Sequence, residues 1–262
     1  MPRKPYPTDL TDEQWEIIQP MLPAAKSDVA QGRKRTTDLR EVIDAILYWT
    51  RSGCSWDMLP HDFPPSDTVY AYFRRWQRKG VIEEIHEKLR ERVRESSGKQ
   101  KAVTAASIDS QSVKTTDVGG EERGFDGNKK VNGRKRHLLV DTLGLVLVVL
   151  VQAANIADVV ATKTVVMAGK LSQPDLQKIW ADLGYRGKKL QELADSLEID
   201  LTLSQKKEKS FKVEPRRWVV ERTFAWLGKQ RRLSKDYERL PEVSQAVVHF
   251  AMIPLMLNRF SS

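Results

Sequence analysis

The spacing of apolar residues changes at a short polar linker, Ser96-Ser-Gly-Lys-Gln100, and this change divides the chain into two parts. Before the linker, apolar residues recur at the three- and four-residue intervals of amphipathic helices. After it, short apolar runs typical of β-strands alternate with helical patterns. The sequence therefore predicts an all-helical domain over residues 1–98 and an α/β domain over residues 99–262.

The first part carries helix start and stop signals. Thr11 begins a cap-like pattern, Gly53 ends a second helix, and Ser66 can cap a third helix that Gly80 closes. The third helix has an apolar stripe and a basic outer side, and a short turn precedes it. This pattern is typical of a helix-turn-helix DNA-binding motif. We expect helices from residue 11 to about residue 19 and over residues 39–50, 66–79 and 81–94.

The second part mixes strands with helices. We expect strands over residues 103–113, 138–140, 145–151, 176–182 and 199–203. We expect a Gly-rich charged loop over residues 116–133 and helices over residues 157–169, 187–197, 214–232 and 243–257. Five strands in a mixed sheet with helices on both faces form the ribonuclease-H-like arrangement, which is the fold class we predict.

The charge balance indicates a polyanionic partner. The net charge is +9, which suits nucleic acid better than a small metabolite. A membrane surface is the weaker alternative, because the longest apolar stretch, residues 143–154, is shorter than the roughly 18 residues of a transmembrane helix. Residues 1–7 lack the apolar core of a signal peptide, and Cys54 is the only cysteine, which excludes an internal disulfide and a cysteine-based zinc site. We expect a cytoplasmic protein.

Two aspartates stand at strand positions that suit metal ligands. Asp109 lies in the middle of a predicted strand, where aspartate is disfavoured. Asp182 ends an apolar strand just before Gly184 and Gly187. Phosphodiester chemistry with two metal ions needs about three carboxylates converging on one edge of a sheet, since hard cations prefer oxygen ligands. The structural alternatives are an edge-strand or turn role for Asp109 and a helix-cap role for Asp182.

Glu221 is the candidate for the third carboxylate. Steps of about 100° per residue place Val220, Phe224 and Leu227 on one side of it along a helix, with Trp218 and Ala225 on the other. A carboxylate among apolar neighbours requires a cation, either a metal ion or a paired side chain. Arg217, one turn earlier, is the alternative to a metal.

Other acidic residues have simpler explanations. Asp141 is expected to begin a hairpin turn, Asp126 to lie in a loop turn and Asp158 to cap the following helix. His137, next to a basic run at a strand start, is interpreted as a surface or hydrogen-bonding histidine rather than a catalytic base.

Basic residues occur in runs near predicted loops and helix ends. Any one run can be a solvated helix or strand face, but several together suggest phosphate contacts along a length of DNA. The residues that we assign to DNA binding on this basis are Arg33, Lys34, Arg35, Arg74, Arg75, Arg78, Lys129, Lys130, Arg134, Lys135, Arg136 and Arg231.

With these motifs in view, the chain resembles the DDE transposases of bacterial insertion sequences, close to the insertion-sequence-five group. The resemblance covers nearly the whole chain. It is carried by Leu10-Thr-Asp-Glu-Gln-Trp15, Gly53-Cys-Ser-Trp56, Thr68-Val-Tyr-Ala-Tyr-Phe-Arg-Arg-Trp76, Ile108-Asp-Ser-Gln-Ser-Val-Lys114, Gly133-Arg-Lys-Arg-His137, Ala181-Asp-Leu-Gly-Tyr-Arg-Gly187 and Arg217-Trp-Val-Val-Glu221.

The resemblance implies that Asp109, Asp182 and Glu221 are the catalytic, metal-binding triad. Asp182 and Glu221 are 39 residues apart, which leaves little room for an inserted domain and implies a compact core. Many relatives carry a tyrosine seven residues before the glutamate, an arginine four before it and a lysine seven after it. Here those positions hold Glu214, Arg217 and Gly228, so only the arginine matches, and Arg217 is also assigned to DNA binding. Lys229 or Arg231 can take the place of the lysine in holding DNA.

The resemblance also implies the activity and the partners. We expect two Mg²⁺ or Mn²⁺ ions, binding of the terminal inverted repeats of a mobile element, strand cleavage that exposes a 3′-OH, and transfer of that end to target DNA. Two ends must be held together, which implies at least a homodimer, in a bacterial cytoplasm on the nucleoid. The alternatives are a domesticated DNA-binding protein that does not cut and a stand-alone ribonuclease-H-like nuclease.

Overall fold

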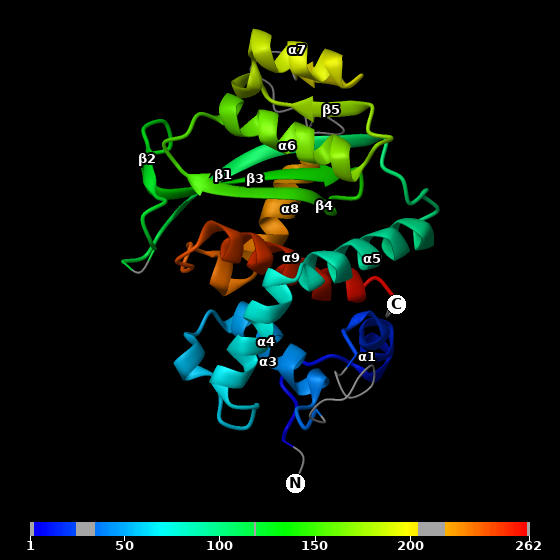
Figure 1. The fold of residues 1–262 in the computed structure, drawn as a ribbon, viewed down its shortest axis with the longest axis vertical. Helices are drawn as coiled ribbons and strands as arrows, with labels where there is room; N and C mark the ends of the chain where they lie inside the picture. Colours follow the sequence, from blue (N-terminus) through cyan, green and yellow to red (C-terminus); the bar gives the residue numbers. More distant parts are fainter. Residues whose placement is uncertain (1–2, 25–34, 118, 204–217, 261–262) are drawn as a thin grey trace.

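A computed structural model describes residues 3–24, 35–117, 119–203 and 218–260. The helices before residue 80 form the lower part of the molecule in Figure 1, the helix of residues 81–96 lies at mid-height, and the β-sheet lies above it. The helical elements of the first part are α1 (Asp12–Ile18), η1 (Gln19–Met21), α3 (Leu39–Ser52), η2 (Trp56–Met58), α4 (Ser66–Arg78) and α5 (Val81–Ser96).

Local signals set the ends of these helices. Thr11 and Gln14 form a capping box, in which each side chain accepts the other residue's backbone N–H at 3.2 Å. Gly53 ends α3 in the left-handed conformation with φ 75°, as the sequence predicts. The expected cap of α4 is off by one residue, because Ser66 is the first residue of the helix and Pro65 precedes it as the cap.

Within the described residues the sheet has six strands, where five were predicted. The strand that was missed is β2, which lies inside the expected loop over residues 116–133 and is only three residues long. The expected strand at residues 138–140 begins earlier and contains the basic run at 134–136. The six strands are β1 (Ala105–Lys114), β2 (Gly124–Asp126), β3 (Val131–Asp141), β4 (Val146–Ala153), β5 (Lys178–Ala181) and β6 (Asp200–Leu203).

β3 is the central antiparallel strand. It pairs with β1 along one edge and with β2 and β4 along the other. β5 and β6 extend the sheet from β1 in parallel pairing, so the order is β2-β3-β1-β5-β6 with β4 also on β3. The mixed sheet that the sequence predicts is confirmed.

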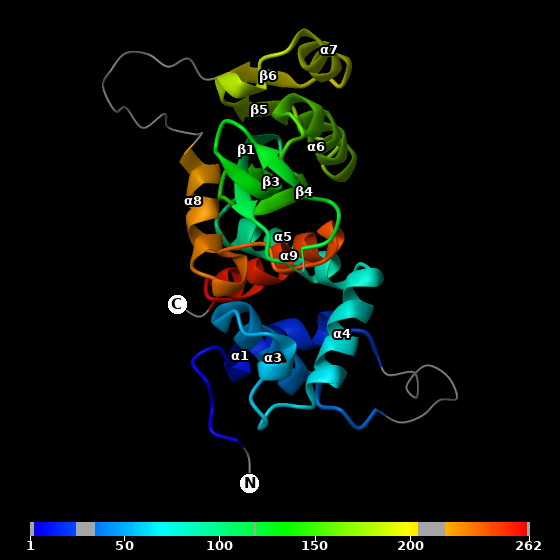
Figure 2. The ribbon, with the colours of Figure 1, turned by 90° about the vertical axis from the view of Figure 1, so that its left-hand side faces the viewer.

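Helices cover both faces of the sheet, as expected (Figure 2). On one face, Leu139 of β3 packs in a core with Val165 and Val166 of α6 (Asp158–Ser172). On the other, Leu138 belongs to a core with Val220 of α8 (Trp218–Gly228) and with α9. The remaining elements are η3 (Leu183–Tyr185), α7 (Lys188–Ser196), η4 (Arg231–Leu233) and α9 (Pro241–Leu257).

The second of these cores is shared between the two parts of the chain. It includes Trp49 of α3 and Leu89 of α5 together with residues of α8 and α9. The rings of His86 in α5 and His249 in α9 also meet, with centroids 4.8 Å apart. The helical part therefore packs directly on α9, and the domain boundary near residue 98 stays a prediction. Within the described residues, no helix combines the length and apolar character needed to cross a membrane.

Candidate active site

The parallel pairing of β1 with β5 brings two of the three predicted carboxylates to equivalent positions along neighbouring strands. Ser107 pairs with Trp180, and Asp109 and Asp182 each follow two residues later. Adjacent strands are about 4.8 Å apart. Asp109 and Asp182 therefore lie on neighbouring strands at the point where β5 ends.

Both aspartates belong to the face of the sheet that α8 covers. Asp109 pairs with Leu138, whose side chain packs in the core under α8 and α9. Ile179 and Ala181 of β5 pack in the core under α6, so strand alternation directs Asp182 to the opposite face. The sheet thus presents two carboxylates toward α8.

The helix-cap alternative for Asp182 is also observed. Its Oδ1 accepts the backbone N–H of Gly184 at 2.8 Å and caps the single turn η3. The Asp182 carbonyl accepts the N–H of Tyr185 at 3.2 Å. The turn therefore fixes the direction of the carboxylate just beyond the strand, as a ligand in that position requires.

Glu221 is the fourth residue of α8, and the structure corrects the argument made for it. The expected apolar neighbours Val220, Phe224 and Leu227 are buried, but the Glu221 side chain is exposed. The buried arc of α8 runs on the other side of the helix, so burial alone does not require a cation at Glu221. Arg217, the alternative partner, lies outside the described residues.

α8 is docked beside β1 through the β3–β4 turn. The Thr223 hydroxyl donates to the carbonyl of Gly144 at 2.8 Å, and Arg222 Nη2 donates to the carbonyl of Leu143 at 3.0 Å. This attachment places the helix that carries Glu221 against the face with Asp109 and Asp182. Within the ranges that the structure describes, three acidic, histidine or cysteine side chains do not gather closely enough to hold a metal ion.

The other acidic residues have the structural roles predicted for them, with one shift. Asp141 begins the hairpin turn, accepting the N–H groups of Leu143 and Leu145 at 2.9 Å, and it also pairs with Arg94 at 2.7 Å. Asp126 accepts N–H groups within its turn. Asp158 is the first residue of α6 rather than its cap.

Arg134, Lys135 and Arg136 do not lie on the surface, so the prediction that they contact DNA phosphates needs correction. Each is at most 5% exposed, because β3 is the central strand. Arg134 donates to the carbonyls of Gly119, Glu122, Glu238 and Arg239. Arg136 donates to the carbonyls of Leu233 and Lys235.

Lys135 and His137 belong to a buried polar cluster on the α6 side of β3. Lys135 Nζ lies 3.1 Å from the Asp158 carboxylate and 3.7 Å from that of Asp126. The hydroxyls of Ser110 and Ser112 donate to the same two carboxylates. His137 is fully buried rather than on the surface, but the predicted hydrogen-bonding role is observed, because its Nε2 lies 3.2 Å from the side-chain amide nitrogen of Gln152. Burial lowers the pKa of His137 to about 4, so the imidazole is neutral.

The remaining basic residues proposed for DNA binding are at least partly accessible wherever they are described. Arg75 and Arg78 are exposed on α4, while Arg74 is half-buried. Lys129, Lys130, Lys229 and Arg231 are exposed, and the half-buried Arg35 donates to the carbonyl of Pro23. Arg33 and Lys34, like Arg217, lie outside the described residues.

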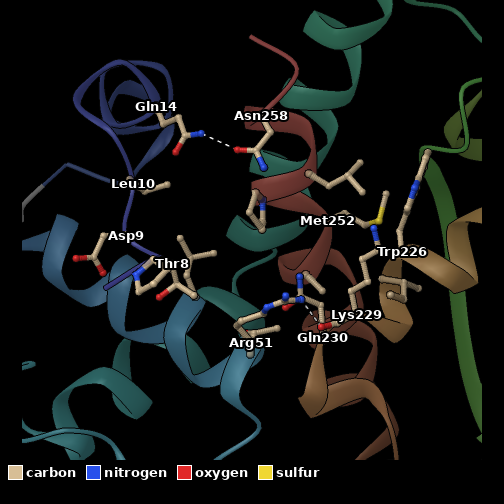
Figure 3. Close-up of a pocket in the computed structure, with 17 residues that line it drawn as sticks. Thr8, Asp9, Leu10, Gln14, Arg51, Trp226, Lys229, Gln230, Met252 and Asn258 are labelled. Carbon is tan, nitrogen blue, oxygen red and sulfur yellow. Dashed lines mark hydrogen bonds between the residues drawn. The ribbon is translucent and has the colours of Figure 1, made fainter. Parts of the chain in front are cut away.

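A cavity of about 430 Å³ lies where the N-terminal segment meets α3, α8 and α9 (Figure 3). Arg51 donates to the carbonyl of Lys229 across it, and Gln14 donates to Asn258 at 2.9 Å. Its walls include Trp226 and Met252. Sequence patterns did not indicate this cavity, because its lining comes from four segments that are distant in the chain.

Comparison with known proteins identifies two family matches. A model described as a putative transposase of the IS4/5 family matches residues 10–86. A model described as the transposase DDE domain matches residues 104–255, a range that contains Asp109, Asp182 and Glu221.

Three curated proteins are similar over parts of the chain. An uncharacterized 16.2 kDa protein of insertion element IS402 from Burkholderia cepacia is 29% identical over 114 residues, which is 42% of this chain and 76% of that protein. A putative transposase for insertion sequence element IS402 from the same organism is 30% identical over 123 residues, 44% of this chain and 58% of the relative. The uncharacterized protein y4sN of Sinorhizobium fredii is 33% identical over 76 residues, 29% of this chain and 58% of that protein.

The DDE model covers more than half of the chain and spans the mixed sheet, α8 and most of α9. Divalent-metal dependence and the cleavage and transfer of DNA strands are typical of this domain. The chain belongs to the DDE transposase family.

Proposed function

We propose that this transposase cuts and joins DNA at the face of the sheet beside α8, with Asp109, Asp182 and Glu221 as its catalytic carboxylates. The observation that carries the proposal is that Asp109 and Asp182 occupy equivalent positions along neighbouring parallel strands, on the face against which α8 is docked. α8 supplies the third carboxylate from its first turns.

The donor set fits a divalent cation. Carboxylate oxygens are the ligands that Mg²⁺ and Mn²⁺ prefer, and the proposal assigns two such ions to this site. When bound, the ions supply charge stabilisation of the attacking and leaving oxygens. Since the described residues hold no closed group of three ligands, Glu221 is expected to approach the two aspartates when metal and DNA bind.

The chain's own residues prepare the site in three ways. The Gly184 N–H fixes Oδ1 of Asp182, and β3 holds Asp109 in the middle of the sheet. The contacts of Thr223 and Arg222 with the β3–β4 turn set the position of α8. These contacts orient the carboxylates first for water attack on a phosphodiester and then for attack by the released 3′-OH.

The proposed DNA partner is the pair of terminal inverted repeats of an insertion sequence. α4 follows the short turn η2, and its exposed Arg75 and Arg78 suit phosphate contacts beside a groove. Lys229 and Arg231, which follow α8, are further exposed basic residues. Two ends must be held at once, so we propose that the protein acts as at least a homodimer.

The test is cleavage and strand transfer on oligonucleotide duplexes that carry the element's ends. Asp109→Asn, Asp182→Asn and Glu221→Gln should each abolish both steps while binding the same duplex as wild type. Glu242→Gln, an exposed glutamate in the first turn of α9, is the matched control and should stay active. Full cleavage by Asp109→Asn would overturn the assignment.

The same assay separates the two alternatives. A DNA-binding protein that has lost its chemistry would bind the ends but show no Mg²⁺- or Mn²⁺-dependent cutting. A stand-alone nuclease would cleave an RNA–DNA hybrid at least as fast as the inverted-repeat duplex and would join nothing. The transposase proposal requires cutting and joining of the repeat duplex.

A further inference from the structure

The hydroxyl of Tyr185 is buried beside the proposed active site. The residue is 2% exposed, and within the described part of the chain its hydroxyl makes no hydrogen bond. Ser110, whose side chain lies next to this hydroxyl, donates its own proton to Asp158 at 3.1 Å. A buried polar group without a partner is costly, so its presence calls for a function.

Three carboxylates act electrostatically on this hydroxyl. Burial and then the negative charges of Asp109, Asp158 and Asp182 raise the pKa of Tyr185. The phenol therefore keeps its proton at neutral pH, where it can act as a neutral donor or acceptor. Each of these carboxylates can accept a hydrogen bond from the phenol.

The backbone ties Tyr185 to the same turn that fixes Asp182. η3 begins directly after Asp182, and the N–H of Tyr185 donates to the Asp182 carbonyl. The Tyr185 ring packs in the core with Ala106 and Ile108 of β1 and with Ala181 of β5. The ring is thus anchored between the two strands that carry Asp109 and Asp182.

We propose that Tyr185 is a positioning residue whose hydroxyl donates to the Asp109 carboxylate when a divalent cation occupies the site. The inference rests on the proposed function, since it requires Asp109 to be a metal ligand. Ligating carboxylates are commonly oriented by such donors, which fix the direction of the oxygen that faces the cation. The Tyr185 hydroxyl is already positioned in the metal-free protein, and the Asp109 carboxylate would accept its hydrogen bond when a cation is bound.

A purely structural role for Tyr185 makes a different prediction. If the ring only fills space in the core, phenylalanine would do so without burying a hydroxyl that has no partner. Tyr185→Phe would then match or exceed the stability of wild type under all conditions, with and without metal. The proposed role predicts instead that the effect of the substitution depends on the cation.

The experiment compares wild type, Tyr185→Phe and Asp109→Asn, with Tyr48→Phe as a control remote from the sheet. In EDTA, Tyr185→Phe should melt at or above the wild-type temperature. Its affinity for Mn²⁺, measured by calorimetry or electron paramagnetic resonance, should fall about 10- to 100-fold. The rise in melting temperature on adding Mn²⁺ should shrink, while binding of repeat duplex in EDTA stays unchanged.

Each outcome decides a different question. If Asp109→Asn weakens Mn²⁺ binding and Tyr185→Phe does not, the positioning role is overturned and the proposed function stands. If Asp109→Asn leaves Mn²⁺ binding intact, the metal site itself is misassigned and both proposals fall. A lower melting temperature of Tyr185→Phe in EDTA would show that the hydroxyl already has a partner without metal, which also overturns the inference.

Discussion

Arg134 of β3 and Asp236, in the segment before α9, form an ion pair of 3.4 Å in which neither side chain is more than 1% exposed. Arg134 also donates to four backbone carbonyls from two segments, and the Ser244 hydroxyl of α9 donates to Asp236 at 2.6 Å. The central strand is thereby joined to α9, on which the N-terminal helices pack. Arg134, which the sequence pattern assigned to DNA binding, therefore has a structural role and links β3 to the segment before α9.

The first prediction concerns this link. Arg134→Met removes the only positive charge paired with Asp236 among the described ion pairs and leaves four carbonyls without their donor. Breaking a buried pair by removing one partner costs about 3–5 kcal/mol. Urea unfolding should show a loss of this size, whereas Lys130→Met, at an exposed position, should change stability by less than about 0.5 kcal/mol. An unchanged midpoint for Arg134→Met would contradict the structural role.

The second prediction concerns stability against pH. Burial lowers the pKa of His249 from 6.5 to about 4, so the folded protein keeps this histidine neutral. Between these two values the unfolded chain binds a proton that the folded chain does not, and stability is lost as the pH falls from 6.5 toward 4. His249→Gln should remove this part of the loss, about 2 kcal/mol between pH 7 and pH 4.5.

The comparison must be made between the two proteins, because other groups titrate in the same range. Burial raises the pKa of Asp44 to about 7, which stabilises the fold as the pH falls and has the opposite sign. That contribution is common to wild type and His249→Gln and cancels in their difference. Parallel stability curves for the two proteins from pH 7 to pH 4.5 would contradict the assignment.

The third prediction concerns the proposed DNA contacts on α4. Arg75→Gln and Arg78→Gln should each weaken binding to any DNA sequence and lower the slope of log affinity against log salt by about 1. Lys88→Gln is the control, since Lys88 is also exposed but lies on α5 in an ion pair with Glu84. Fluorescence anisotropy at several salt concentrations gives the slopes. An unaltered slope for both arginine variants would remove α4 from the DNA surface.

The fourth prediction concerns the turn that docks α8. Gly144 has φ 80°, and a Cβ there would lie 3.0 Å from Thr223 Oγ1 and from the Trp226 ring. Gly144→Ala should cost about 1–2 kcal/mol from the left-handed backbone alone. It should also reduce cleavage by shifting Glu221. Gly127→Ala, where a Cβ meets nothing within 4 Å, should preserve both stability and activity.

Much of the fold followed from apolar periodicity. The order of strands and helices, the capping at Thr11, the end of α3 at Gly53 and the hairpin at Asp141 were all predictable, because each depends on residues within a few positions of one another. β2 was missed because three residues carry no periodic signal. To predict that Asp109 and Asp182 lie at equivalent positions on neighbouring strands, one needs the register of β1 and β5, which the sequence does not specify.

The errors at the site share a physical cause. Arg134 and Arg136 each donate to carbonyls about a hundred residues away, and such long-range partners leave no local pattern. The helical wheel identified the neighbours of Glu221 but not which arc of α8 faces the core. Tyr185 lies in a motif that carries the family resemblance, yet only the structure shows that its hydroxyl is buried and has no hydrogen-bond partner among the described residues.

The hydrophobic core shared by α3, α5, α8 and α9 holds the helical part of the protein at a fixed distance from the proposed active site. If α4 binds the end of the element, its distance to Asp109 is set by packed side chains rather than by a flexible tether. The number of base pairs between the recognised sequence and the cut is then a property of the protein. Transplanting the first 98 residues between relatives should move the cleavage position unless the facing surface of α9 is transplanted as well.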